Sequence, residues 1–278
     1  MRKFSRLGFL QVILTVALFG SPLGATNTSD REVIDMGPES QLSEAGIAIT
    51  IPTLKATLSE PSIPVETRYL SALALGRTKN FEVIPALLGA LEASEPRVRV
   101  GAVSGLAFVS SPIAVPDLRT VLLSDPDMEV KAAAMWALAE IGTDAAIAAL
   151  AEAASDESQT EAIRVDSVLY IGRYPRDPCV GPVLARLLNS DSAEIRAGAA
   201  VAAAHARVGL RVIPHIAEAA LNPAISEPLR RGAIQVLEDL TGEDFLYTKS
   251  TGGFAQGDER ADALQQLAEW WDKERINH

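Results

Sequence analysis

The sequence is poor in the side chains on which most catalytic and metal sites depend. Its 278 residues include one cysteine and three histidines, and only 5% are aromatic. The single Cys179 excludes an internal disulfide, and three scattered histidines provide no zinc-binding spacing. Motifs for a nucleophile elbow or a phosphate-binding loop are also missing. We therefore expect a protein that is not an enzyme, with no cofactor and no metal site.

Positive charge is scarce as well. The chain has 25 Lys and Arg against 36 Asp and Glu, a formal net charge of −11, and it contains no run of basic residues. Loss of residues 1–25 would remove three positive charges and no negative one, which moves the net charge to −14. Nucleic acid and anionic membrane surfaces are repelled by such an average charge, so we expect no nucleic-acid partner.

The first 25 residues have the three-part layout of a secretory signal peptide. Basic residues come first, an apolar run follows from Leu7 to Gly20, and small residues surround Ala25. The apolar run is shorter than the roughly 20 residues that a membrane-spanning helix needs, although an uncleaved anchor is the alternative. We predict a periplasmic or secreted protein without a stable membrane span after cleavage. Residues 26–40 are polar and predict a flexible linker.

From residue 41 onward, a pair of helices recurs about every 32 residues. The first helix of most pairs begins with proline, which fits a first turn because its missing N–H would have had no partner there. The second helix carries a basic residue near its start, with the same period. The prolines are Pro52, Pro85, Pro116, Pro182 and Pro214, with Ala148 in the fourth pair, and the basic residues are Arg68, Arg99, Lys131, Arg164, Arg196 and Arg230.

The second helices are rich in alanine. Counted from the basic residue, positions three, four and seven are apolar or small, as in Ala102, Val103 and Leu106, and this spacing is typical of a helix core stripe. Alanine allows a helix to approach neighbours on two sides, which a stack of helix pairs requires. Four glycines lie near the predicted ends of these helices, where a left-handed residue closes the last turn. They are Gly76, Gly142, Gly172 and Gly242.

The units VRVGAVSGLAFV, EVKAAAMWALAEIG and EIRAGAAVAAAHA follow Pro-led helices such as IPALLGALEASEPRVR. They resemble HEAT repeats, of the variety first associated with phycobilisome lyases, over about residues 41–242. The resemblance implies an all-α, right-handed α-solenoid of about six HEAT-like helix pairs. It also implies an Asp six residues before each basic residue. Only Asp125, before Lys131, keeps that spacing, so we expect no continuous Asp–Arg ladder.

The tail resembles the closing segment of many bacterial HEAT-repeat proteins, through TGEDFLY (241–247), a Gly-rich loop and a final helix over 258–275. We predict that 243–278 form a C-terminal capping helix with its preceding loop, which covers the last repeat of a solenoid spanning 41–278. The apolar face of this helix is expected to consist of Ala261, Leu264, Leu267, Ala268 and Trp271.

HEAT-like repeats serve adaptors, scaffolds and a few enzymes alike. The deoxyhypusine hydroxylases bind iron through repeated His-Glu pairs, but here Ala206 follows His205 and Ile216 follows His215. The likeness to phycobilisome lyases raises a pigment-transfer role, yet those lyases act on cytosolic proteins whereas this chain is predicted to be exported. Neither enzymatic function is therefore favoured.

Three acidic residues at alternate positions, Asp125, Asp127 and Glu129, have the oxygen ligands of a calcium loop. The run lacks the glycine turn and the distant bidentate Glu of such loops. An ordinary turn that caps the following helix is the favoured interpretation.

The exposed surface of the second helices remains as a candidate site. Positions one, five and nine after the basic residue point away from the core, and aromatic and Arg side chains are the usual anchors of interfaces. We predict a non-catalytic protein-binding or scaffolding module that presents this surface to a partner protein or peptide. One alternative is an enzyme subunit or lyase-like protein with its site in irregular loops, such as 248–257; another is that these side chains only pack between repeats. The candidate partner-binding residues are Tyr69, Arg77, Phe108, Trp136, Leu169, Arg173 and His205.

Overall fold

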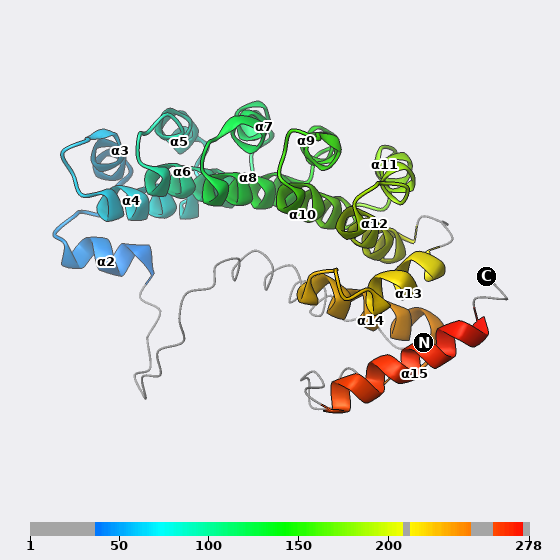
Figure 1. Cartoon of the computed structure of the whole chain (residues 1–278). Coiled ribbons are helices and arrows are strands. Elements are labelled where there is room, and N and C mark those ends of the chain that lie inside the picture. The colour runs from blue at the N-terminus through cyan, green and yellow to red at the C-terminus, as the bar shows by residue number, and fades with distance from the viewer. Residues whose placement is uncertain (1–36, 208–211, 246–257, 275–278) are drawn as a thin grey trace. The chain divides into compact units, whose positions relative to one another are not determined.

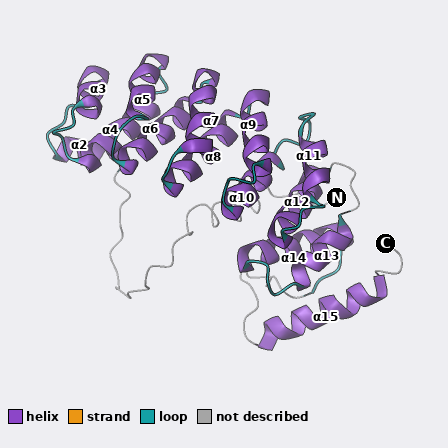
Figure 2. Ribbon diagram, turned by 45° about the horizontal axis from the view of Figure 1, so that its top comes forward, coloured by secondary structure: helices purple, strands orange, loops and turns teal. Residues whose placement is uncertain are grey.

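The computed structural model describes residues 37–207, 212–245 and 258–274. The predicted signal peptide, most of the predicted linker and the Gly-rich loop 248–257 lie outside these ranges. Within them the chain forms α-helices and two short 3₁₀-helices and no strand, so the predicted all-α class is confirmed (Figure 2). None of the helices in these ranges is long and apolar enough to cross a bilayer.

The helices form two compact units that divide within one helix, after Ala153. In the N-terminal unit, the first helices of three predicted pairs lie side by side in one layer and their second helices in another (Figure 1). Two 3₁₀-helices, Phe81–Val83 and Pro112–Ala114, connect successive pairs. The helices of this unit are α2 (Pro38–Glu44), α3 (Ile51–Ser59), α4 (Val65–Arg77), α5 (Ile84–Ala90), α6 (Pro96–Val109), α7 (Val115–Ser124), α8 (Met128–Ile141) and most of α9 (Asp144–Ser155).

The C-terminal unit continues the same alternation of helices. Here α11 and α13 are first helices, α10, α12 and α14 are second helices, and a longer helix ends the unit. All six predicted pairs are therefore present in the described residues. The helices of this unit are α10 (Glu161–Ile171), α11 (Val180–Leu187), α12 (Ala193–Ala206), α13 (Ile213–Leu221), α14 (Glu227–Thr241) and α15 (Asp258–Glu274).

The recurring basic residue has a structural reason. In every pair its side chain donates to a backbone carbonyl in the last turn of the first helix of the same pair or within three residues after it, as Arg68 Nε does to Leu58 O at 3.1 Å. The last carbonyls of a helix have no partner within it, and a positive charge is favourable at this negative end of the helix dipole. The basic residue therefore recurs about every 32 residues because each helix pair contains this one contact. The pairs are Arg68–Leu58, Arg99–Ala93, Lys131–Leu123, Arg164–Ala154, Arg196–Ser190 and Arg230–Ala220.

The four glycines divide into two kinds. Gly142 and Gly242 end α8 and α14 with positive φ of 62° and 77°, so their predicted left-handed conformation is confirmed. The prediction is wrong for Gly172, whose φ is −59°, and for Gly76, which lies inside α4. A Cβ on Gly76 would lie 2.4 Å from Cα of Gly105 on α6. Its function is therefore to let two second helices touch.

Alanine has the predicted packing role. In α8, Ala134, Ala137 and Ala139 are at most 1% exposed, which places several sides of this helix in the core. The leucine side chains of the first helices, such as Leu118 and Leu122 in α7, are also completely buried and fill the space between the two layers.

The C-terminal helix α15 packs on α13 and is joined to α14 by an ion pair between Arg260 and Glu227. Leu267 is fully buried as predicted, but Ala261 is exposed, and Ala263 takes its place in the core at 1% exposure. The buried stripe is thus rotated from the predicted one, because Ala263 and Leu267 share one face at a spacing of four residues.

Candidate protein-interaction surface

The candidate residues fall into two sets that belong to different units. Tyr69 and Arg77 lie on α4, Phe108 on α6 and Trp136 on α8, all in the N-terminal unit. Leu169 and Arg173 follow in or just after α10, and His205 lies in the last turn of α12, so these three belong to the C-terminal unit. We call the side of α4, α6 and α8 that faces away from α3, α5 and α7 the second-helix face (Figure 1).

Phe108 and Trp136 form an edge-to-face aromatic pair between neighbouring second helices. Their ring centroids are 5.8 Å apart and the ring planes meet at 80°. This is a favoured geometry, because the positive edge of one ring meets the negative face of the other. Phe108 is 37% exposed and Trp136 is partly exposed. The two rings therefore contact each other in a favoured geometry and are still accessible from outside, as an interface anchor must be.

Tyr69 is covered by an arginine that sequence analysis missed. The guanidinium carbon of Arg97 lies 3.7 Å above the centre of the Tyr69 ring, a cation–π contact. Arg97 also pairs with Glu66 at 3.3 Å and with Glu129 at 3.7 Å, so it connects three successive repeats. All three charged residues stand two positions before the basic residue of their helix. Their alternating sign at the repeat period was a usable signal in the sequence.

Arg77 is also engaged within the chain. Its Nε lies 3.1 Å from Oε1 of Glu39, on the short helix α2, and Leu42 of α2 is completely buried. Helix α2 begins inside the segment predicted as a linker, with Pro38 in its first turn. It packs on α4 and thereby occupies part of the second-helix face.

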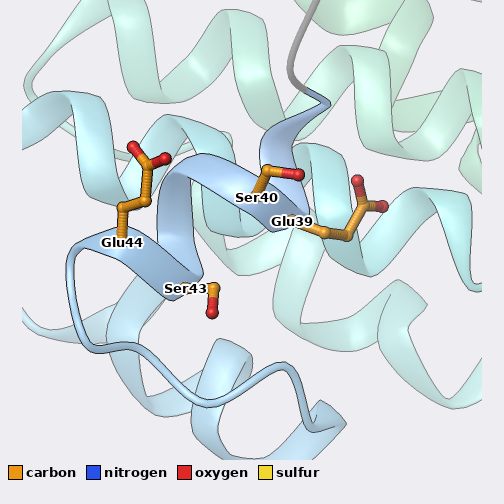
Figure 3. A pocket seen from close by; sticks show the side chains of 4 residues that line it. All are labelled: Glu39, Ser40, Ser43 and Glu44. Atoms are coloured by element: carbon orange, nitrogen blue, oxygen red, sulfur yellow. The ribbon is translucent and has the colours of Figure 1, made fainter.

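The exposed side of α2 carries a shallow hollow that is open to solvent. Figure 3 shows the four polar side chains that line it, Glu39, Ser40, Ser43 and Glu44. Small-molecule sites are typically enclosed and mostly apolar, and this hollow is neither. Between α12 and α13, a second cavity beside Arg196 and His215 has a volume of about 10 Å³, which leaves room for about one water molecule.

Two of the three candidates of the C-terminal unit, Leu169 and Arg173, are less accessible than Phe108. Leu169 is 5% exposed, so its side chain packs in the protein, and Arg173 is half-buried. Desolvation lowers the pKa of His205 to about 4. The imidazole lies at an exposed position and is neutral at pH 7, because its pKa is below the ordinary value.

The two aspartates of the acidic turn before α8 accept hydrogen bonds from groups of the protein itself. Asp125 accepts two hydrogen bonds from Arg99, at 2.8 and 2.9 Å, and one from the backbone of Asp127. Asp127 caps α8 by accepting from the N–H groups of Glu129 and Val130. The favoured capped turn is thus present, and the part of the chain that the structure describes contains no cluster of His, Cys, Asp or Glu suited to a metal ion.

Asp125 also forms the one expected step of the Asp–Arg ladder. Its partner is Arg99 of the preceding repeat, and the two side chains are only 7% and 9% exposed. The hydrogen bond to Asp125 raises the pKa of Arg99, so this guanidinium stays charged. One step earlier, Arg68 uses Glu95 instead, at 3.2 Å.

Comparison with known sequences assigns the class. HEAT repeats match residues 51–139, 90–167 and 115–205, which together extend over more than half of the chain. The chain therefore belongs to the HEAT-repeat family, and its helix pairs form an α-solenoid of this class. HEAT repeats usually mediate binding to other proteins. A search of the curated proteins finds no match.

Two solved structures show a distant similarity. The complex of CpcE and CpcF of phycocyanin lyase from Nostoc sp. is 17% identical, with a TM-score of 0.39, and the match covers 90% of this chain and 98% of that one. Human deoxyhypusine hydroxylase in complex with glycerol is 15% identical, with a TM-score of 0.26, over 84% of this chain and 99% of that one.

Proposed function

We propose that the protein is a non-catalytic binding or scaffolding module that captures a partner protein on the second-helix face of its N-terminal unit. The observation that carries this proposal is the aromatic pair, in which Phe108 stays 37% exposed while held edge-to-face against Trp136. Fixed, partly exposed aromatic side chains lose little entropy when a partner covers them and supply much of the binding energy of interfaces.

A second aromatic pair in the chain supports this interpretation. Phe245 and Trp270 have a similar edge-to-face geometry, with centroids 5.4 Å apart, but Phe245 is only 3% exposed. That pair joins α15 to the segment after α14 and is explained by packing alone. The two pairs thus share a geometry and differ in exposure, and of their two phenylalanines only Phe108 remains accessible to a partner.

The proposal includes the cellular location of the protein. The layout of residues 1–25 supports export to the periplasm or beyond, where the mature chain would meet its partner. The competing function is that of an enzyme subunit, or a lyase-like protein of the phycobilisome type, with a site in the loop 248–257. A metal or cofactor that remains with the purified protein would favour that alternative.

The test is capture of a defined partner from the exported fraction by the mature chain. We expect Trp136→Ala to abolish capture and leave the helical circular-dichroism signal unchanged. The matched control is Phe81→Ala, which removes a more exposed aromatic ring (65%) from the connection between α4 and α5. The proposal fails if both variants capture the partner normally, or if Phe81→Ala is as damaging as Trp136→Ala.

A further inference from the structure

Helix α2 shows what kind of structure the second-helix face accepts. It lies beside α4 on the side away from α3 (Figure 1), with Leu42 fully buried and Pro38 buried beside it. Glu39, three residues before Leu42, pairs with Arg77 of α4. A short amphipathic helix with one apolar anchor and one charged side chain therefore already binds this face, supplied by the chain itself.

The same face continues onto α6 and α8. Arg77 stands nine positions after the basic residue of α4, and Phe108 holds the equivalent position on α6. Gly76 and Gly105 bring α4 and α6 into backbone contact, so the two positions lie about one helix spacing apart, on the order of 8–10 Å. At equivalent positions of neighbouring second helices, the side chain is therefore charged on α4 (Arg77) and aromatic on α6 (Phe108).

The chemistry of the face favours a helix as its occupant. Within the described ranges the chain has no strand, and so no sheet edge to which an extended segment could add its backbone hydrogen bonds. An extended peptide on this surface would leave backbone N–H and C=O groups without protein partners, whereas a helix satisfies its own. The aromatic pair calls for an apolar side chain on that helix.

The net charge of the chain indicates which other side chains the bound helix carries. The formal net charge of the chain is −11, so a partner segment with basic residues is attracted and an acidic one is repelled. The face itself shows that a guanidinium can rest on one of its aromatic rings, since Arg97 lies over Tyr69. Basic side chains beside the apolar anchor therefore match both the charge and the aromatic surface.

We infer that the binding segment of the partner is a short amphipathic helix, apolar on one side and flanked by basic residues, that lies beside α2 across α6 and α8. This inference rests on the proposed function and specifies the class of partner. It uses the mode of binding already seen between α2 and α4, with Phe108 and Trp136 in place of Arg77 as the anchor.

The test uses a chain with Trp136 as its single tryptophan, obtained by Trp270→Phe and Trp271→Phe. The probes are four fluorescein-labelled peptides of about 14 residues, or about four helical turns. Three are hydrocarbon-stapled helices: apolar with basic flanks, apolar with acidic flanks, and basic without an apolar stripe. The fourth has the composition of the first with a central proline and no staple, so that it cannot form a continuous helix.

We expect the apolar, basic helix to bind about tenfold more tightly than each of the other three, measured by anisotropy, and to change the emission of Trp136. Phe108→Ser should weaken its binding about tenfold, and Phe81→Ser should leave it unchanged. Equal binding of the proline peptide, a preference for the acidic helix, or an unchanged Trp136 signal would overturn the inference. If Trp136-dependent capture of a partner holds while these results fail, the proposed function stands and only the helical, basic partner is wrong.

Discussion

The two units are built from the same helix pair but connect successive repeats differently. In the N-terminal unit, two of the basic residues that recur once per repeat form an ion pair with a carboxylate of the next repeat. Arg68 pairs with Glu95, and Arg99 pairs with Asp125. In the described part of the C-terminal unit, the equivalent Arg196 donates to backbone carbonyls of its own pair. The capping contact is therefore common to both units, and the ion pair to the next repeat is an addition.

The C-terminal unit uses hydroxyl contacts at the corresponding junctions. Glu161 accepts from Ser192, the N-cap of α12, and Glu194 accepts from both the hydroxyl and the backbone N–H of Ser226 before α14. These serine–carboxylate contacts are exposed, so their polar groups remain hydrated and the contact has little desolvation cost. A repeat period can thus be kept while the interactions between repeats change, and the energetic consequences of breaking them differ.

The largest expected effect is the loss of the buried ion pair. Arg99→Ala leaves Asp125 without its partner at 7% exposure, so we expect a loss of about 3–5 kcal/mol in the free energy of unfolding. The matched change in the other unit, Arg196→Ala, removes only hydrogen bonds to carbonyls and should cost about 1–2 kcal/mol. Urea unfolding checks both values, and equal losses would show that the ion pair adds nothing to the N-terminal unit.

A partly buried acid in the C-terminal unit offers a further comparison between the two units. Desolvation raises the pKa of Asp166 on α10 from 3.8 to about 6. Because the folded-state pKa is the higher one, the stability contributed by the protonated form is complete below about pH 4 and is lost as the pH rises through 6. Asp166→Asn should therefore stabilise the protein by on the order of 3 kcal/mol at pH 7.5.

At pH 3.5 the same substitution should have almost no effect, since the carboxyl group is then neutral in both states. Thermal unfolding at the two pH values measures the difference. The control is Asp125→Asn, which should destabilise the protein at pH 7.5 because it removes a paired charge. A pH-independent effect of Asp166→Asn would contradict the assignment.

A smaller effect is expected where second helices touch. Gly76→Ala places a methyl group 2.4 Å from backbone atoms of Gly105, which cannot move as a flexible side chain can. We expect a loss of about 1–3 kcal/mol from this overpacking. A Cβ on Gly89 in α5 would meet no atom outside its own helix backbone within 4 Å, and Gly89→Ala should stabilise the chain by up to about 1 kcal/mol through helix propensity. Opposite signs in denaturant unfolding confirm the packing role, and equal signs refute it.

The repeat architecture could be predicted because it depends on local rules. Proline in a first turn, a basic residue that caps the preceding helix, and Gly142 or Gly242 in a left-handed C-cap each act over a few residues. The basic residue recurs six times and the proline five times, which made the period visible in a single sequence. The strength of these rules explains why the helix pairs were placed correctly throughout the described residues.

The contacts between repeats could not be predicted in the same way. Whether Leu169 is buried, or whether Arg97 covers Tyr69, depends on the rotation of each helix about its axis, which small changes in packing shift. Gly76 looked like a helix end because it stands one residue before one, yet its close contact is with a helix 29 positions later in the chain. Helix α2 is too short to show periodicity, so nothing in its pattern separated it from a linker.

The most direct measurement is site-specific photocrosslinking on the two layers of the N-terminal unit. A benzophenone side chain replaces Phe108 on the second-helix face, or Thr120, which is exposed on α7 in the layer of first helices. We predict a covalent product with one defined partner from position 108 alone, and its loss on Trp136→Ala. A product of equal yield from position 120, or none from position 108 in the presence of the partner, would contradict the account.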